Sequence, residues 1–128
     1  MDAEIAKQWV ERLKSGKDTK GAGGLSVIVK GAQQDCCMGV LCKMAIEAGV
    51  PVTVTKTQQK YNEEVTEIEY DGKDCYLPES VRKWASMKSK KGCFSHSGDE
   101  AESLVGVNDR NDNFGPVIEK IEQYAEIL

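Results

Sequence analysis

Three cysteines fall within seven positions in the stretch DCCMGVLCKMA, which begins at residue 35. Thiolates bind zinc, attack electrophiles and carry redox chemistry. The pattern favours a helix over 36–48 capped by Asp35, in which neighbouring residues are about 100° apart. Cys36, Cys37 and Cys42 then lack the spacing that brings helical side chains together. Because the segment is apolar nearly all round, we expect these cysteines to pack in the core, with a reactive thiol at Cys36 or Cys37 as the alternative.

A second pair, Cys93 and His96, has the C-x-x-H spacing of half a zinc site. Structural zinc takes four ligands, usually from two paired motifs, and the sequence offers only this pair, with Cys75 as a remote third candidate. A Cys–His nucleophile would also need an acid to orient the histidine, and none is evident. We therefore expect no metal, no cofactor and no catalytic residues.

The best candidate for a ligand site is the stretch VRKWASMKSKKGCF, which brings basic and aromatic residues together in an acidic chain. Cationic groups bind phosphate, and aromatic faces stack nucleotide bases. The alternative is an exposed lysine loop, with Trp84 in the core. The start of the last expected helix offers free N–H groups for a second anion contact. The residues expected to bind a ligand are Arg82, Trp84, Lys88, Lys90, Lys91, Phe94, Asn108, Arg110 and Asn113.

Composition indicates a single globular domain over residues 1–128, with 40% apolar and 30% charged residues. The net charge of −4 argues against a general nucleic-acid binder, which would carry a clear basic excess. No apolar stretch approaches the roughly 18 residues of a membrane span, and the charged first residues do not form a secretory signal. The five cysteines are therefore expected to be free thiols in a cytoplasmic protein.

The periodicity along the chain predicts an α+β fold, in which about four to five helices pack on a small antiparallel sheet. The residues KGAQQ are expected to form a turn, and the last helix is expected to be capped by Asn113. Helices are expected at 2–16, 36–48, 78–87, 100–107 and 113–128, and strands at 25–29 and as a meander within 50–77.

Several segments, in this order, resemble a family of small bacteriophage-encoded proteins: WVERLKSGK, CCMGVLC, LPESVRKWA, and SLVGVNDRNDNF before an amphipathic helix. The resemblance implies a bacteriophage origin but no particular biochemical activity. Such proteins often carry a glutamine and an arginine after SGK, where this chain has Lys20 and Ala22. Lys20 is a partial substitute in a ligand contact made there, because ammonium lacks the bidentate geometry of guanidinium. Lys20 therefore joins the candidate ligand-binding residues.

Without a catalytic constellation, the sequence predicts a protein that works by binding. The first hypothesis is a phage-type counter-defence protein that sequesters a small phosphorylated, nucleotide-like signal of host immunity in the bacterial cytosol, as a homo-oligomer. The second is a protein inhibitor of a host defence enzyme, which docks through an acidic face at Glu67, Glu69 and Asp71. The third is a small nucleotide-processing enzyme that uses either Cys93 and His96 or the acidic strand that contains Glu67 and Glu69.

Overall fold

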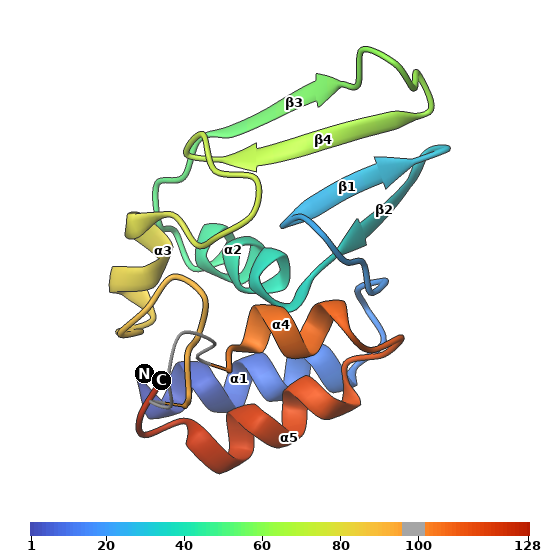
Figure 1. The fold of residues 1–128 in the computed structure, drawn as a ribbon. Helices are drawn as coiled ribbons and strands as arrows, with labels where there is room; N and C mark the ends of the chain where they lie inside the picture. The colour runs from blue at the N-terminus through green and yellow to red at the C-terminus, as the bar shows by residue number, and fades with distance from the viewer. Residues whose placement is uncertain (96–101) are drawn as a thin grey trace.

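The computed structural model describes residues 1–95 and 102–128. A four-stranded antiparallel sheet forms one layer, and the helices lie on one of its faces (Figure 1). The strand order β2-β1-β4-β3 makes β2 and β3 the edges. The predicted α+β class is therefore confirmed. The elements are α1 (Ala3–Lys14), β1 (Ser26–Val29), β2 (Ala32–Asp35), α2 (Cys37–Glu47), β3 (Val54–Gln58), β4 (Val65–Tyr70), α3 (Glu79–Trp84), α4 (Leu104–Asp109) and α5 (Gly115–Tyr124).

Helix α2 lies between the sheet and the outer helices, and it is buried on nearly every side (Figure 1). Cys36, Cys37 and Cys42 are all buried, which confirms the prediction that they pack in the core. Burial raises the pKa of Cys36 to about 11 and also raises the pKa of Cys37 and Cys42, so the alternative of a reactive thiol is wrong. Cys36, rather than Asp35, is the N-cap, and its Sγ accepts a hydrogen bond from the Gly39 N–H at 3.4 Å.

A β-hairpin replaces the turn that was expected at KGAQQ. Lys30 and Gly31 adopt positive φ angles of 51° and 80°, which suit a tight turn between twisted strands. β2 then pairs with β1, and Asp35 lies opposite Ser26. Asp35 therefore ends a strand at the place where a helix cap was expected.

The expected meander over 50–77 is shorter than predicted. β3 begins at Val54 and extends into the polar stretch that was expected to be a loop. After β4 the chain makes one isolated bridge, between Tyr70 and Lys73, and the expected strand ending at Leu77 is absent from this described segment. The chain from Lys73 to Leu77 is irregular, and it lines the candidate site described below.

Several helices end or begin at other residues than expected. α4 begins at Leu104, inside the helix expected over 100–107, of which residues 100 and 101 lie outside the described ranges. α3 stops at Trp84 instead of reaching Met87. α5 has Phe114 at its N-cap position, while Asn113, the expected cap, accepts a hydrogen bond from the Gly115 N–H at 2.9 Å. The amphipathic helix expected there is nevertheless present, since Val117, Ile118 and Ile121 on its inner side are buried.

Candidate functional site

Arg82 is held by its own helix rather than directed to open surface. Its Nε and Nη2 donate hydrogen bonds to the Glu79 carboxylate at 2.9 and 2.8 Å, and its Nη1 donates to the carbonyl oxygen of Met87 at 2.8 Å. These contacts engage three of the five guanidinium N–H groups and close the end of α3. Arg82 therefore has a structural role in this arrangement.

The two aromatic residues of the basic stretch face the core. Phe94 is 6% exposed and stacks on Tyr124, with ring centroids 4.9 Å apart and an interplanar angle of 11°. Trp84 is half-buried and packs against the core. The structure thus gives neither ring a fully open face for a ligand.

The candidates near the last helix have mostly structural contacts. Asn108 is 0% exposed; its Oδ1 accepts from the Cys37 N–H at 3.1 Å, and its Nδ2 donates to the Gly21 carbonyl at 3.0 Å. Asn108 therefore joins α4 to α2 and to the loop after α1. Lys20 donates to the same Gly21 carbonyl at 3.2 Å, whereas the side chain of Arg110 is exposed.

Lysines of the basic stretch do converge on an aromatic ring, and the ring is Tyr76. The Nζ atoms of Lys90 and Lys91 lie 5.2 and 5.0 Å from its centroid, within the range of cation–π contact. Lys88, also expected in this group, is exposed but makes no such contact with Tyr76. Sequence reasoning missed Tyr76 because it assigned the preceding residues to a strand, although Lys73 in the same segment was an available signal of basic character.

Tyr76 lies in a groove formed by three adjoining cavities that share Cys75. The largest has a volume of about 520 Å³ and is lined by Lys73, Tyr76 and Lys90, among others. The two smaller cavities, about 190 and 120 Å³, are bounded by the glycine loop at Gly23. We call this combined hollow the Tyr76 groove. Its volume is large enough for a small organic ligand.

The Tyr76 groove has mixed charge at one end and acidic residues at the other. Lys73 and Lys90 line the cavity at the Tyr76 end together with Asp74 and Glu79, while Asp74 and Glu67 line the smaller cavity on the other side of Cys75. Burial and the neighbouring Asp74 raise the pKa of the Cys75 thiol, which keeps it neutral at ordinary pH. Cys75 is therefore a wall of the groove and is poorly suited to act as a nucleophile.

A buried polar cluster lies at the edge of the Tyr76 groove, and its central residue, Ser26, lines the cavity of about 190 Å³. Ser26 Oγ lies 2.5 Å from Asp35 Oδ1 and 2.8 Å from the Tyr70 hydroxyl. Because the carboxylate only accepts, Ser26 donates to Asp35 and Tyr70 donates to Ser26. Ser26 is 4% exposed, and Lys43 holds the other oxygen of Asp35 at 3.0 Å. This arrangement supports the fold and engages the Ser26 hydroxyl with Asp35 and Tyr70.

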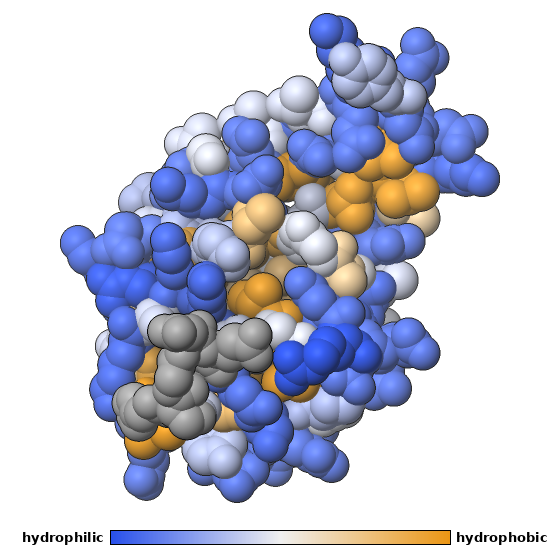
Figure 2. Space-filling model, viewed as in Figure 1, coloured by the Kyte–Doolittle hydropathy of each residue, from blue (hydrophilic) through white to orange (hydrophobic). Residues whose placement is uncertain are grey.

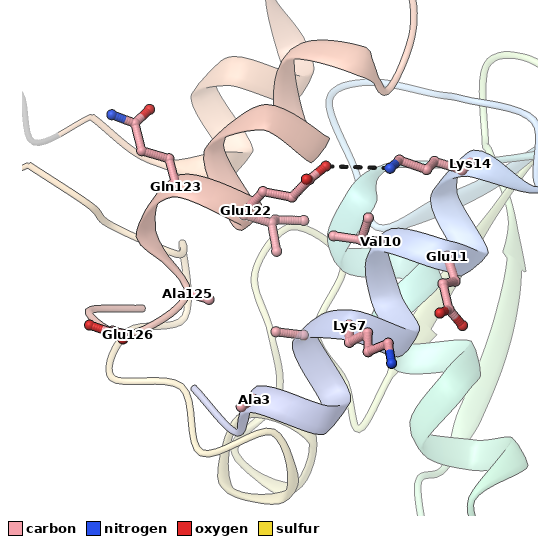
Figure 3. Close-up of a pocket in the computed structure, with 11 residues that line it drawn as sticks. Ala3, Lys7, Val10, Glu11, Lys14, Glu122, Gln123, Ala125 and Glu126 are labelled. Carbon is pink, nitrogen blue, oxygen red and sulfur yellow. Dashed lines mark ion pairs between the residues drawn. The ribbon is translucent and has the colours of Figure 1, made fainter.

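A second hollow lies between α1 and α5, and Figure 3 shows it with its lining side chains. Its volume is about 740 Å³. Val10 and Ile121 lie at its base, and the ion pair between Lys14 and Glu122, 3.5 Å long, crosses it. We call it the α1–α5 groove. Its lining contains no cysteine, serine or histidine, and its charged residues are exposed lysines and glutamates.

Neither metal binding nor membrane insertion gains support from the described residues. Within 1–95 and 102–128, no group of three or more His, Cys, Asp or Glu side chains could hold a metal ion. His96, the expected partner of Cys93, lies outside those ranges. In the same part of the chain, no helix is long and apolar enough to cross a membrane.

The sequence matches a family described as a domain of unknown function (DUF8296) over residues 1–125. The chain belongs to this family. No curated protein and no solved structure matches the chain. The family match spans the Tyr76 groove and every lining residue of the α1–α5 groove except Glu126.

Proposed function

We propose that this protein binds and sequesters a small phosphorylated, nucleotide-like ligand in the Tyr76 groove, without catalysis. The observation that carries the proposal is the pair of ammonium groups, on Lys90 and Lys91, over the ring of Tyr76 beside a cavity of about 520 Å³. Lysine ammonium groups attract phosphate, and an aromatic face stacks a base.

The contacts of the Tyr76 groove favour binding over turnover. In the described residues that line its largest cavity, the acidic groups are Asp74 and Glu79, and Glu79 is already paired with Arg82. The Cys75 thiol has a raised pKa, so it supplies no thiolate. A ligand would therefore be held by charge and stacking, with no group poised to cleave it.

The biological setting of the proposal comes from the resemblance to small phage proteins. In that setting the ligand is a nucleotide signal of bacterial immunity, and the protein acts in the host cytosol by lowering the free concentration of that signal. Sequestration needs affinity and abundance rather than catalytic groups, which agrees with the composition of the Tyr76 groove.

Isothermal titration calorimetry with AMP, ATP and inorganic phosphate tests this proposal. We expect the nucleotides to bind, and the double variant K90A/K91A to bind ATP at least tenfold more weakly, or ~1.4 kcal/mol, because both ammonium groups are lost. Y76A should also weaken the nucleotides, by ~1–3 kcal/mol, while Y76F keeps the ring and should retain them.

The matched control is K60A, at the tip of the β3–β4 hairpin. Lys60 lies 5.7 Å from the ring of Tyr61, so it forms the same kind of contact away from the groove. Its removal should leave nucleotide affinity unchanged. Equal affinity in wild type, K90A/K91A and Y76A would reject the Tyr76 groove as the site, and absence of binding in all three would reject a nucleotide ligand of this panel.

A second candidate function, inhibition of a host enzyme by docking, is favoured by the outer face of the sheet. Val27, Val29 and Val65 are half-exposed there, and the strand register places Glu67 and Glu69 on the same face. Figure 2 shows apolar surface over the end of the sheet where β1, β2 and β4 meet. Apolar side chains beside acidic ones suit a partner with a basic, partly apolar surface. A stoichiometric protein partner, with no nucleotide bound, would favour this candidate.

A further inference from the structure

The α1–α5 groove has small side chains at its open end. Figure 1 shows α1 and α5 side by side, running in opposite directions, with the two ends of the chain close together. Ala3, Ala6 and Ala125 line the groove toward these ends, as Figure 3 shows for Ala3 and Ala125. Small residues allow another helix to approach closely, at the interaxial distance of about 8–10 Å that helix pairs adopt.

The two rims of the groove carry opposite charge. The α1 rim has two lysines, Lys7 and Lys14, with one glutamate, Glu11, and the α5 rim has two glutamates, Glu122 and Glu126. All five side chains belong to exposed residues. The α1 rim is therefore positive on balance, and the α5 rim is negative.

Only one of these opposite charges is paired across the groove. Lys14 reaches Glu122 at 3.5 Å (Figure 3). Lys7 and Glu126 make no ion pair with any of the described residues. The end of the groove near Ala3 thus has an unpaired cation on one rim and an unpaired anion on the other.

A second copy of the chain has the charges that fit this arrangement. A two-fold axis parallel to the helices would place α1 of each copy on α5 of the other, without shifting residues along the axis. Lys14 would then lie level with Glu122 of the second copy, as it already does within its own chain. Lys7 would gain Glu126 of the second copy. The alternative two-fold axis lies in the plane of the interface and is perpendicular to the helices. It would place α1 of one copy on α1 of the other, so that lysines would face lysines.

We propose that the α1–α5 groove is the interface of a symmetric homodimer in which α1 of each copy packs on α5 of the other. Charge complementarity sets the pairing, and the groove accepts the apolar stems of the opposing lysines. The dimer forms whether or not the Tyr76 groove is occupied.

Sedimentation velocity over a range of protein concentrations tests the dimer. We expect wild type to associate at low ionic strength and to dissociate in 1 M NaCl, where the Debye length falls to about 3 Å. The variant K7E/K14E, with two acidic rims, and the variant E122K/E126K, with two basic rims, should each remain monomeric.

Mixing the two variants gives the decisive result. Each then offers the charge that the other lacks, so an equimolar mixture should form a heterodimer, and a chain carrying all four substitutions should form a homodimer again. The matched control is E119K, because Glu119 is an exposed glutamate of α5 that does not line the groove, and it should dimerise as wild type does.

Three results would overturn the proposal. The first is a wild type that stays monomeric at low ionic strength at every concentration. The second is a variant with two like-charged rims that dimerises as wild type does. The third is a mixture of the two variants that fails to associate although both retain the wild-type circular dichroism spectrum.

Discussion

Gly39 fixes the distance between α2 and the sheet. A Cβ at this position would overlap the carbonyl oxygen of Leu25 and lie 2.7 Å from the Leu25 carbonyl carbon and 2.8 Å from Ser26 Oγ. Leu25 directly precedes β1, and its backbone is held by hydrogen bonds with Asp74 and Cys36, so it cannot move aside as a side chain can. We expect G39A to lower the free energy of unfolding by ~3 kcal/mol, at the upper end for an overpacked core, as measured by urea denaturation.

The control for G39A is G106A, at a helical glycine with more room. An added Cβ there would meet Arg110 Nη1 at 3.2 Å and Ser103 Oγ at 3.4 Å. Arg110 is the far end of an exposed side chain and can shift, while alanine favours the helix by up to ~1 kcal/mol. A G39A variant as stable as G106A would mean that α2 can move away from β1.

The residues of the Tyr76 groove illustrate what composition alone can and cannot predict. The lysine-rich stretch identified Lys90 and Lys91 from their charge, because charged side chains are nearly always at the surface. It paired them with Trp84 and Phe94, whose rings instead pack inward. Tertiary contacts between distant segments decide which aromatic ring lies beside a given lysine. Such contacts cannot be predicted from the residues that neighbour the lysine in the sequence.

At the scale of elements, β3 is an edge strand with an evident means of avoiding self-pairing. All five of its residues are exposed. Lys56 lies opposite Ile68 in the register, on the face of the sheet that elsewhere packs on the helices. A charged residue on the inner face of an edge strand prevents a second strand from adding there, because the charge would be buried.

Replacing Lys56 should therefore expose β3 to strand addition. We expect K56V to form oligomers that grow with protein concentration, as measured by multi-angle light scattering after size exclusion. The measurement is best made in the E122K/E126K background, so that the α1–α5 groove does not contribute. T55V is the control, since Thr55 lies opposite Glu69 on the outer face and leaves Lys56 in place. Oligomers of T55V equal to those of K56V would rule out a special role for Lys56.

β2 shows why one strand escaped sequence-based prediction. Its sequence, AQQD, has no β-branched or aromatic residue and therefore favours a turn. The structure places Gln33 and Asp35 on the inner face, where Gln33 Nε2 donates to Asp35 Oδ1 at 3.0 Å. These polar side chains can face inward because Lys43 supplies the charge that Asp35 needs. A strand that is stabilised by a side chain from another element cannot be recognised from its own residues. The helices α1 and α5 can be recognised, because their apolar residues recur with helical spacing.

At the scale of the whole molecule, one chain of ion pairs joins the helical layer to the sheet. Arg12 of α1 holds Asp18 through Nε at 2.7 Å, and Asp18 accepts from Lys43 of α2 at 2.6 Å. Lys43 in turn contacts Asp35 of β2 at 3.0 Å. The side chains of Asp18 and Asp35 are almost fully buried, and no described buried polar side-chain atom lacks a hydrogen-bond partner. The network is thus fully satisfied, which is the condition under which buried charges are tolerated.

Protonation of Asp18 should weaken this connection in acid. Although burial opposes the shift, hydrogen bonds from Arg12 and Lys43 lower the pKa of Asp18 in the folded state. A carboxyl group whose pKa is lowered by folding contributes stability above its unfolded pKa, about 3.9, and loses that contribution as the pH falls through its folded pKa. We expect D18N to lower the free energy of unfolding by ~3–5 kcal/mol at pH 7, because two cations lose their anion.

The difference in free energy of unfolding between wild type and D18N should therefore be constant above about pH 5 and should shrink below about pH 4, in urea denaturation across that range.

D71N provides the control: hydrogen bonds from Ser80 and from the Thr53 N–H also lower the pKa of Asp71, but this carboxylate is exposed. Solvent competes for its contacts, so its loss should cost no more than ~1 kcal/mol. The loss of unfolding free energy in D18N could instead persist unchanged to pH 3, where Asp18 in the wild type loses its advantage of charge. That result would show that the amide disrupts packing. A cost that disappears in acid would show that the layers are joined by the carboxylate itself.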